Sequence, residues 1–322
     1  MIKKIVIGLV MVFGLFLLTK KKHTSNKKIE REKIEKTIEE VFAIPAQFLE
    51  EDKKYINKFK SYTTSGIEKF LEENSELSNA KNIFYPFSGG DILYPLTIFP
   101  EADNIFLVSI EPLGSEKINN LVPISNNTKS LVDRSFLVTK NMRESFSDDF
   151  GVLNMIAEEL TILGVDKFVI KEFNKEKKSF VISFLYNNRE RNIFYFKKNI
   201  NDFYIDEKFL KNIFDFYKID ATIIKAASYL MHDKKLFHKI RNFIISHSKM
   251  IVQDDSGIPI RFFKNFDLKF IGTYKGPYGK SFKRFFQKEL VGKKSYSQNV
   301  IHCYGYGGGK RKPFIILAKR KL

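Results

Sequence analysis

Two adjacent glycines and a later glutamate form the pattern in this chain that is best suited to holding a small molecule. Ser88, Gly89, Gly90 and Asp91 follow the apolar segment NIFYPF. Glu111 follows a second apolar segment about 20 residues later, the separation found in dinucleotide-binding units. Glycines let the backbone turn sharply, and an acid at the tip of the next strand accepts hydrogen bonds from ribose. The spacing therefore predicts that these five residues bind a nucleotide-type cofactor.

Each of these residues also has a purely structural interpretation. Two adjacent glycines are a weaker signal than a full G-x-G-x-x-G pattern and can serve a turn without a ligand. Asp91 can cap the following helix through its carboxylate. Glu111 contributes to a site only if it lies in a cleft at a strand end. The sequence leaves these alternatives open.

A second acidic candidate follows the short apolar segment KMIVQ. Asp254 and Asp255 precede a Ser-Gly-Ile-Pro turn. Ligands of open α/β sheets bind beyond the carboxyl ends of the strands. We therefore expect Asp254 and Asp255 to face the same crevice as Gly89, Gly90 and Glu111, and to act there as catalytic carboxylates. A tight turn, in which aspartate side chains bond to nearby backbone, explains the pair as well. The histidines form no i, i+4 pair, so no metal site is predicted.

The chain needs a sheet and flanking helices to position these residues. Helical spacing extends over residues 27–81, with helices predicted at 46–59 and 65–77, and it returns at 153–163, where Gly164 is a stop signal. Three strands separated by turn sequences, at residues 166–173, 178–186 and 191–199, predict an antiparallel meander. We expect a loop around residues 123–127, helices at 219–231 and 235–246, and a terminal hairpin formed by residues 299–306 and 313–321.

The amino terminus carries a membrane-targeting pattern. MIKK precedes an apolar run at residues 5–18, and three lysines follow at residues 20–22. At about 1.5 Å per residue the run is shorter than a bilayer core of about 30 Å, which suits a signal segment or an uncleaved anchor. No A-x-A site or cysteine follows the run. Lysines on both sides leave the orientation open, with the bulk expected outside the cytoplasm.

Charge is unevenly distributed along the chain. The 322 residues carry a formal net charge of +18, yet residues 61–160 hold 7 Lys and Arg against 15 Asp and Glu. The basic excess therefore lies in the carboxyl-terminal half, where an anionic lipid or an envelope polymer is a candidate partner. Nucleic acid is disfavoured, because no zinc-finger, helix-turn-helix or RNP-type pattern accompanies the charge. Cys303 is the only cysteine, so no internal disulfide can form.

Two resemblances follow from these segments. The segments FYPFSGGDILY…SIEPLG and KAASYLMH…QDDSGIPIRFF resemble an uncharacterised family of bacterial exported, lipoprotein-like proteins, although this chain has no lipidation cysteine after its apolar run. The order of helical layer, strand, glycine turn, strand with acid, later acidic loop and terminal hairpin is more remotely similar to class I S-adenosylmethionine-dependent methyltransferases. That similarity implies S-adenosylmethionine as the cofactor. Its glycine pattern is usually richer, and no NPPY-like tetrapeptide is present.

The sequence therefore predicts an α/β protein with a Rossmann-like, methyltransferase-like mixed sheet, an antiparallel meander insertion and N-terminal helices. Its predicted parts are a membrane anchor or signal segment at 1–22, a helical neck and layer at 23–80, and the α/β domain at 81–322. The leading functional hypothesis is a membrane-anchored or exported bacterial envelope protein with a degenerate pocket used for binding or assembly. The alternatives are a methyltransferase-like enzyme and a basic-surface protein that binds nucleic acid or an anionic polymer.

Overall fold

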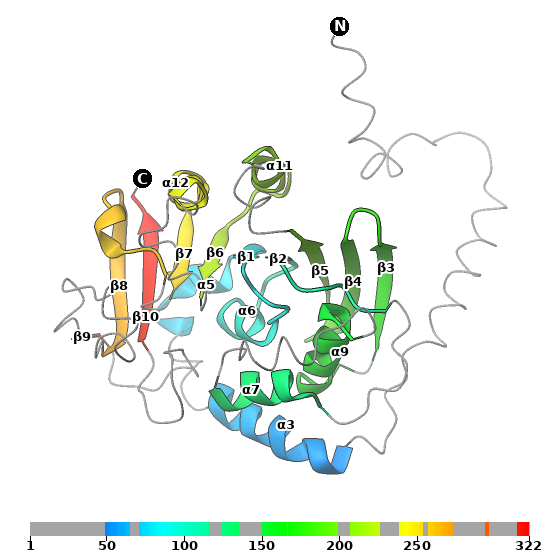
Figure 1. Cartoon of the computed structure of the whole chain (residues 1–322). Helices are drawn as coiled ribbons and strands as arrows, with labels where there is room; N and C mark the ends of the chain where they lie inside the picture. The colour runs from blue at the N-terminus through cyan, green and yellow to red at the C-terminus, as the bar shows by residue number, and fades with distance from the viewer. Residues whose placement is uncertain are drawn as a thin grey trace, which may run out of the picture. The chain divides into compact units, whose positions relative to one another are not determined.

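The computed structural model describes residues 49–64, 71–115, 124–134, 150–165, 167–198, 207–225, 238–253, 257–273, 294–295 and 314–321. They form an α/β fold in which helices cover both faces of one mixed, ten-stranded sheet (Figure 1). Among the described helices, none is both long and apolar enough to cross a membrane. The apolar run at residues 5–18 lies outside the described residues.

Five parallel strands form the centre of the sheet. They are β1 (Asn82–Pro86), β2 (Asn104–Ser109), β5 (Arg189–Lys197), β6 (Ala221–Ile224) and β7 (Met250–Gln253). The strand order of the whole sheet is β3-β4-β5-β2-β1-β6-β7-β10-β8-β9. The chain thus moves from β1 outward through β2 to β5, and then returns to the other side of β1 for β6 and β7. Consecutive buried residues in β1, β2, β6 and β7 fit a sheet that is covered on both faces.

An antiparallel meander extends one edge, as the sequence predicts. It consists of β3 (Phe168–Asn174), β4 (Ser179–Tyr186) and β5. Asn187 and Asn188 connect β4 to β5 with φ angles of 51° and 59°. Two consecutive residues with positive φ make the type I′ turn that matches the twist of a hairpin, and asparagine tolerates that conformation better than most residues. The turn explains why the second strand ends at residue 186 as predicted, whereas the third begins at Arg189, two residues before its predicted start.

The opposite edge differs from the predicted terminal hairpin. The last strand, β10 (Phe314–Arg320), lies antiparallel between β7 and β8 (Phe266–Thr273), and β8 also pairs with β9 (Lys294–Ser295). Strand β8 was missed although Phe266, Leu268 and Phe270 alternate with Asp267 and Lys269, which is the pattern of a strand. Residues 299–306, the other half of the predicted hairpin, lie outside the described residues.

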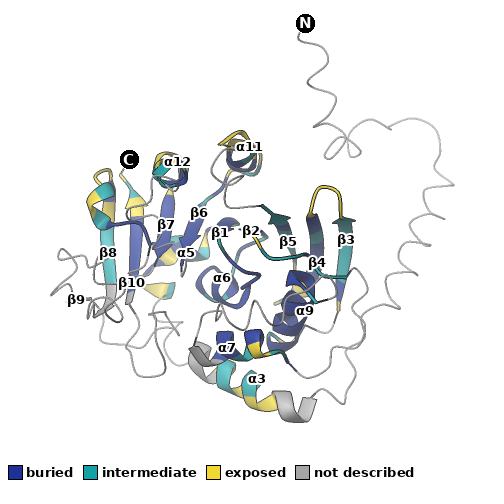
Figure 2. Ribbon diagram, in the orientation of Figure 1, coloured by how far each residue is buried: buried dark blue, intermediate teal, exposed yellow. Residues whose placement is uncertain are grey.

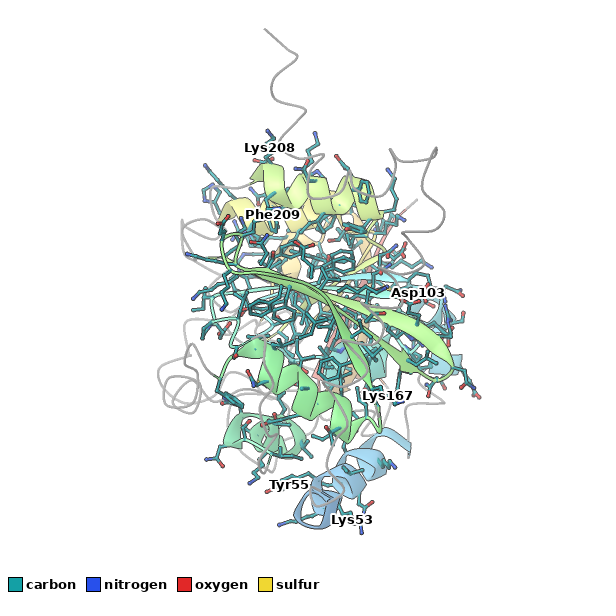
Figure 3. The ribbon with its side chains drawn as sticks, turned by 90° about the vertical axis from the view of Figure 1, so that its right-hand side faces the viewer. Lys53, Tyr55, Asp103, Lys167, Lys208 and Phe209 are labelled. Carbon is teal, nitrogen blue, oxygen red and sulfur yellow. The ribbon has the colours of Figure 1, made fainter. Side chains whose placement is uncertain are left out.

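Helices form a layer on each side of the sheet (Figures 1 and 3). One face carries α11 (Glu207–Tyr217), α12 (His238–His247) and the short 3-10 helix η5 (Ile260–Phe262). The other face carries α5 (Ser75–Ser78), α6 (Leu93–Ile98) and α9 (Val152–Ile162). Beyond α9 lie α7 (Asn126–Arg134) and α3 (Leu49–Thr64). Every residue of α9 is buried, because the sheet, α6, α7 and α3 surround it (Figure 2).

One helix prediction and one loop prediction are wrong. Residues 221–224 form the buried strand β6, and the helix before it, α11, ends at Tyr217. A short, continuous apolar run fits a buried strand and a buried helix equally well, and here the neighbours β1 and β7 supply the hydrogen bonds of a strand. The predicted loop around residues 126–127 is the start of α7, whose Thr128 N–H donates to Ser125 Oγ at 3.3 Å.

The prediction that α9 stops at Gly164 is confirmed, since Gly164 has a φ of 77° and Val165 N–H bonds back to Leu160 O.

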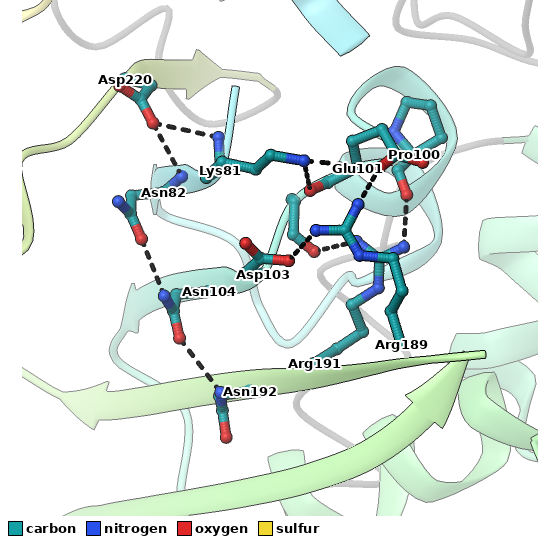
Figure 4. A network of polar contacts seen from close by, with 11 residues as sticks. Lys81, Asn82, Pro100, Glu101, Asp103, Asn104, Arg189, Arg191, Asn192 and Asp220 are labelled. Atoms are coloured by element: carbon teal, nitrogen blue, oxygen red, sulfur yellow. Dashed lines mark hydrogen bonds and ion pairs between the residues drawn. The ribbon is translucent and has the colours of Figure 1, made fainter. Parts of the chain in front are cut away.

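Polar side chains bind the amino-terminal ends of the parallel strands together (Figure 4). Asn104 donates to Asn82 at 2.8 Å, and Asn192 donates to Asn104 at 3.1 Å, which forms a ladder across β1, β2 and β5. Beside the ladder, the Arg189 guanidinium bonds to the carboxylates of Glu101 and Asp103. Side chains therefore cross-link the amino-terminal ends of these strands. The predicted site lies at the other end of the same strands, their carboxyl ends, which are called the carboxyl edge below.

Candidate functional site

The glycine turn follows β1 directly and has an unusual backbone. Phe87, Gly89 and Gly90 have φ angles of 60°, 61° and 95°, and Ser88 is buried. A Cβ built on Gly90 would lie 2.8 Å from Val152 Cγ1 at the start of α9. Glycine at position 90 is thus required both by its conformation and by the close approach of α9. The turn has a structural explanation independent of any ligand.

Two buried carboxylates occupy the amino terminus of α6, the helix that follows the turn. Asp91 Oδ1 accepts the Tyr94 N–H at 3.1 Å, as expected for a capping residue. Glu159 Oε2, from α9, accepts the N–H groups of Ile92 at 2.6 Å and Leu93 at 3.1 Å. In dinucleotide-binding units a pyrophosphate takes this position. Here protein carboxylates already use the three donors.

A buried ion pair joins the turn to β6. Lys225, directly after β6, bonds through Nζ to Asp91 Oδ2, which also accepts the Tyr85 hydroxyl at 3.0 Å. The same ammonium lies 4.6 Å from the centre of the Tyr94 ring. Burial, and then the charge of Asp91, raise the pKa of Glu159 well above its usual value. The arrangement is a charged Asp91–Lys225 pair beside a glutamate that favours its protonated form.

Glu111 lies just beyond β2 and is connected to the glycine turn. Ser109, the last residue of β2, donates its hydroxyl to Glu111 Oε2. Its own Oγ accepts the Gly89 N–H at 3.1 Å. The Tyr195 hydroxyl, from β5, donates to the backbone carbonyl of Glu111 at 2.7 Å. The glycine turn and the acid therefore lie side by side at the carboxyl ends of β1 and β2.

The environment of Glu111 places its titration near neutral pH. Burial raises the pKa of this partly buried carboxyl to about 7. Backbone N–H groups of Glu111 and Ile110 and the charge of Lys197 act in the opposite direction and are outweighed. Burial, followed by the nearby Glu111, raises the pKa of Tyr195 well above its usual value, which keeps this phenol protonated. Glu111 can therefore change charge when a ligand or a proton arrives.

The remaining predicted part of the site is the pair Asp254 and Asp255, and the structure describes the chain before this pair only as far as Gln253. Gln253 ends β7 in register with Ile224 of β6, at the carboxyl edge of the sheet. Its side chain closes the next loop, donating to Ile258 O at 2.7 Å and accepting Ile258 N–H at 2.8 Å. Asp254 and Asp255 lie outside the described residues, so their predicted catalytic role stays a prediction.

The structure thus brings Ser88, Gly89, Gly90, Asp91 and Glu111 to one edge of the sheet, but in two environments. Asp91 is turned inward and used by the fold, whereas Glu111 is partly exposed. The sequence interpretation missed Lys225, Glu159 and Ser109. Glu159 had a visible signal, because a carboxylate in the apolar segment VLNMIAEELTIL must be buried or paired. Lys225 ends an apolar strand but was read as part of a helix.

The described residues contain no group of three or more His, Cys, Asp or Glu side chains arranged to hold a metal ion. Comparison of the chain with protein-family models, with curated proteins and with solved structures finds no match.

Proposed function

We propose that this protein is a membrane-tethered or exported envelope protein whose α/β domain binds a ribonucleoside-containing ligand at the carboxyl edge of β1 and β2. The observation that carries the proposal is the contact chain from Gly89 through Ser109 to Glu111. It holds a partly exposed carboxylate beside a glycine turn. A carboxylate in this position accepts hydrogen bonds from vicinal ribose hydroxyls.

The order of the strands supports a nucleotide-type ligand. Counted in sequence, the parallel strands β1, β2, β5, β6 and β7 lie in the order 3-2-1-4-5, which is the order of dinucleotide-binding sheets. The order reverses between β1 and β6, and ligands of such sheets bind beyond the carboxyl ends at the reversal. The glycine turn and Lys225 both lie at this point. A Rossmann-like fold is accordingly part of the proposal.

The amino terminus of α6 narrows the class of ligand. Its three donors are taken by Asp91 and Glu159, so a dinucleotide cannot place its pyrophosphate there without displacing two buried carboxylates. The geometry therefore favours a mononucleoside ligand over NAD or FAD.

A methyltransferase-like enzyme that uses S-adenosylmethionine is the second candidate. The resemblance noted from the sequence implies a terminal antiparallel element after the parallel core, and β8 and β10 form such an element beside β7. In this alternative, Glu111 binds the ribose of S-adenosylmethionine and Asp254 lies near the acceptor.

Calorimetric titration of the full chain with adenosine tests the binding proposal. We expect saturable binding that Glu111→Ala abolishes, because the variant removes the acceptor for both ribose hydroxyls. Ser115→Ala, also after β2, is the control and should bind as the wild type does. If the wild type and Glu111→Ala bind adenosine with the same affinity, Glu111 does not bind the ribose and the proposal is disproved.

A reporter fused after Leu322 tests the location. Activity of a reporter that works only outside the cytoplasm would support export or tethering with the domain outside. It would also weigh against the enzyme alternative, because S-adenosylmethionine is a cytoplasmic metabolite. Activity of a cytoplasm-dependent reporter would contradict the exported form of the proposal.

A further inference from the structure

A row of lysines continues the candidate site along the carboxyl edge. These residues, called the lysine rim below, are Lys175, Lys177, Lys178, Lys197 and Lys198. Three belong to the turn between β3 and β4, and two end β5 and follow it. The turn contains one acidic residue, Glu176, so the rim carries a strong positive excess.

Backbone hydrogen bonds fix the rim next to the ribose-binding residues. Lys198 N–H donates to Ser109 O at 2.7 Å, and Lys197 N–H donates to Lys178 O at 2.8 Å. Ser109 is the residue that bonds to both Gly89 and Glu111. Hydrogen bonds through Ser109 and the end of β5 therefore connect Glu111 to the β3–β4 turn.

Charge and exposure indicate an anionic ligand group. Lys175, Lys177 and Lys178 are exposed, and Lys197 is close enough to lower the pKa of Glu111. Lys198 lies 4.4 Å from the centre of the Phe209 ring at the start of α11, which directs this ammonium toward the α11 side of the edge. A lysine ammonium binds phosphate as a compact point charge.

We propose that the lysine rim is a phosphate-binding subsite next to Glu111, and that the ligand is a phosphorylated ribonucleoside. This inference rests on the proposed function for the ribose part. The usual place for phosphate, the helix amino terminus after the glycine turn, is filled by Asp91 and Glu159. The rim is the cationic group that adjoins Glu111 at this edge in the described part of the chain. Phosphate can also come from a separate phosphorylated molecule bound beside the nucleoside.

Titration of the full chain with adenosine, ATP and inorganic tripolyphosphate tests the subsite. We expect ATP to bind about tenfold or more tightly than adenosine at low salt, and the difference to shrink as salt screens the exposed charges. The triple variant Lys175→Gln, Lys177→Gln, Lys178→Gln should reduce ATP affinity about tenfold and leave adenosine affinity within about twofold. The salt dependence needs no variant and is independent of any folding defect.

A charge-matched control uses α3, which lies on the other side of the sheet from α11 (Figure 3). Lys53→Gln, Lys54→Gln, Lys60→Gln removes the same charge and should leave ATP affinity unchanged. An equal loss in both triple variants would overturn the subsite, since net charge alone would then explain it.

The remaining outcomes separate the sources of phosphate. Tripolyphosphate that binds without displacing adenosine, together with ATP no tighter than adenosine, would support the rim with a separate phosphorylated molecule as its ligand. If ATP binds no more tightly than tripolyphosphate and adenosine does not bind, the result would support the lysine rim as a phosphate site and contradict the ribose proposal. Binding of neither ATP nor tripolyphosphate would overturn the inference.

Discussion

Lys225 and Asp91 form an ion pair in which 2% and 3% of the two side chains are exposed. The pair joins the end of β6 to the turn after β1, at the point where the strand order reverses. It therefore fixes the glycine turn in place. Removing one partner of a buried pair leaves an uncompensated charge, which costs about 3–5 kcal/mol.

Lys225→Met should accordingly lower the free energy of unfolding by about 3 kcal/mol or more. The double variant Asp91→Asn, Lys225→Met should recover part of this loss, because the asparagine carbonyl still caps Tyr94 and no charge is left buried. Urea denaturation of both single variants and the double variant measures the coupling. Additive losses would contradict a direct interaction between the two side chains.

Gly90→Ala should be more destabilising than Gly164→Ala. Both glycines have positive φ angles, 95° and 77°, so alanine is strained by about 1–2 kcal/mol at either position. Only at Gly90 would the new Cβ also collide with Val152, whereas Gly164 has open space around it. Overpacking adds about 1–3 kcal/mol, which thermal or urea unfolding resolves. Equal losses would show that the approach of α9 to the turn is not tight.

Protonation of Glu111 should make both stability and binding depend on pH. Its folded pKa is raised from 4.5 to about 7, so its contribution to stability is fully present below pH 4.5 and is lost as pH rises through 7. Glu111→Gln removes this contribution, and the difference in unfolding free energy between variant and wild type should change across that window. A difference independent of pH would contradict the raised pKa.

The same protonation predicts opposite behaviour for ligand binding. In the proposed complex, ribose hydroxyls donate to the ionised carboxylate. Adenosine affinity should therefore increase as the pH rises, by about tenfold per pH unit up to pH 7, and stay constant above it. Calorimetric titration with adenosine between pH 5 and pH 9 measures this change in affinity. A single titrating proton can change the affinity by at most about tenfold per pH unit. The weaker binding that remains in Glu111→Gln should lack this slope. An identical slope in the variant would assign the titration to another group.

Local patterns in the sequence were enough to predict the parts of the fold that are set by local chemistry. The meander follows from alternation and from the Asn187–Asn188 turn, and the end of α9 follows from Gly164. The position of β6 could not be predicted, because a four-residue apolar run takes its conformation from its neighbours. Those neighbours are distant in sequence.

The same limit applies to the candidate site. Gly89 and Glu111 could be predicted to share an edge, because they end adjacent parallel strands. The partners of Asp91 could not, since Lys225 is 134 residues away and reaches the turn only after the sheet has formed. Glu159, 67 residues from Ile92, is likewise brought to α6 by tertiary packing.

We propose above that Glu111 holds a ribose at the carboxyl ends of β1 and β2. Titration of the full chain with adenosine and with 2′,3′-dideoxyadenosine, in the wild type and in Glu111→Gln, tests it most directly. We predict that the wild type binds adenosine at least about tenfold more tightly than the dideoxy compound, and that the variant binds both equally weakly. Equal affinity of the wild type for the two nucleosides, or no binding of either, would contradict the account.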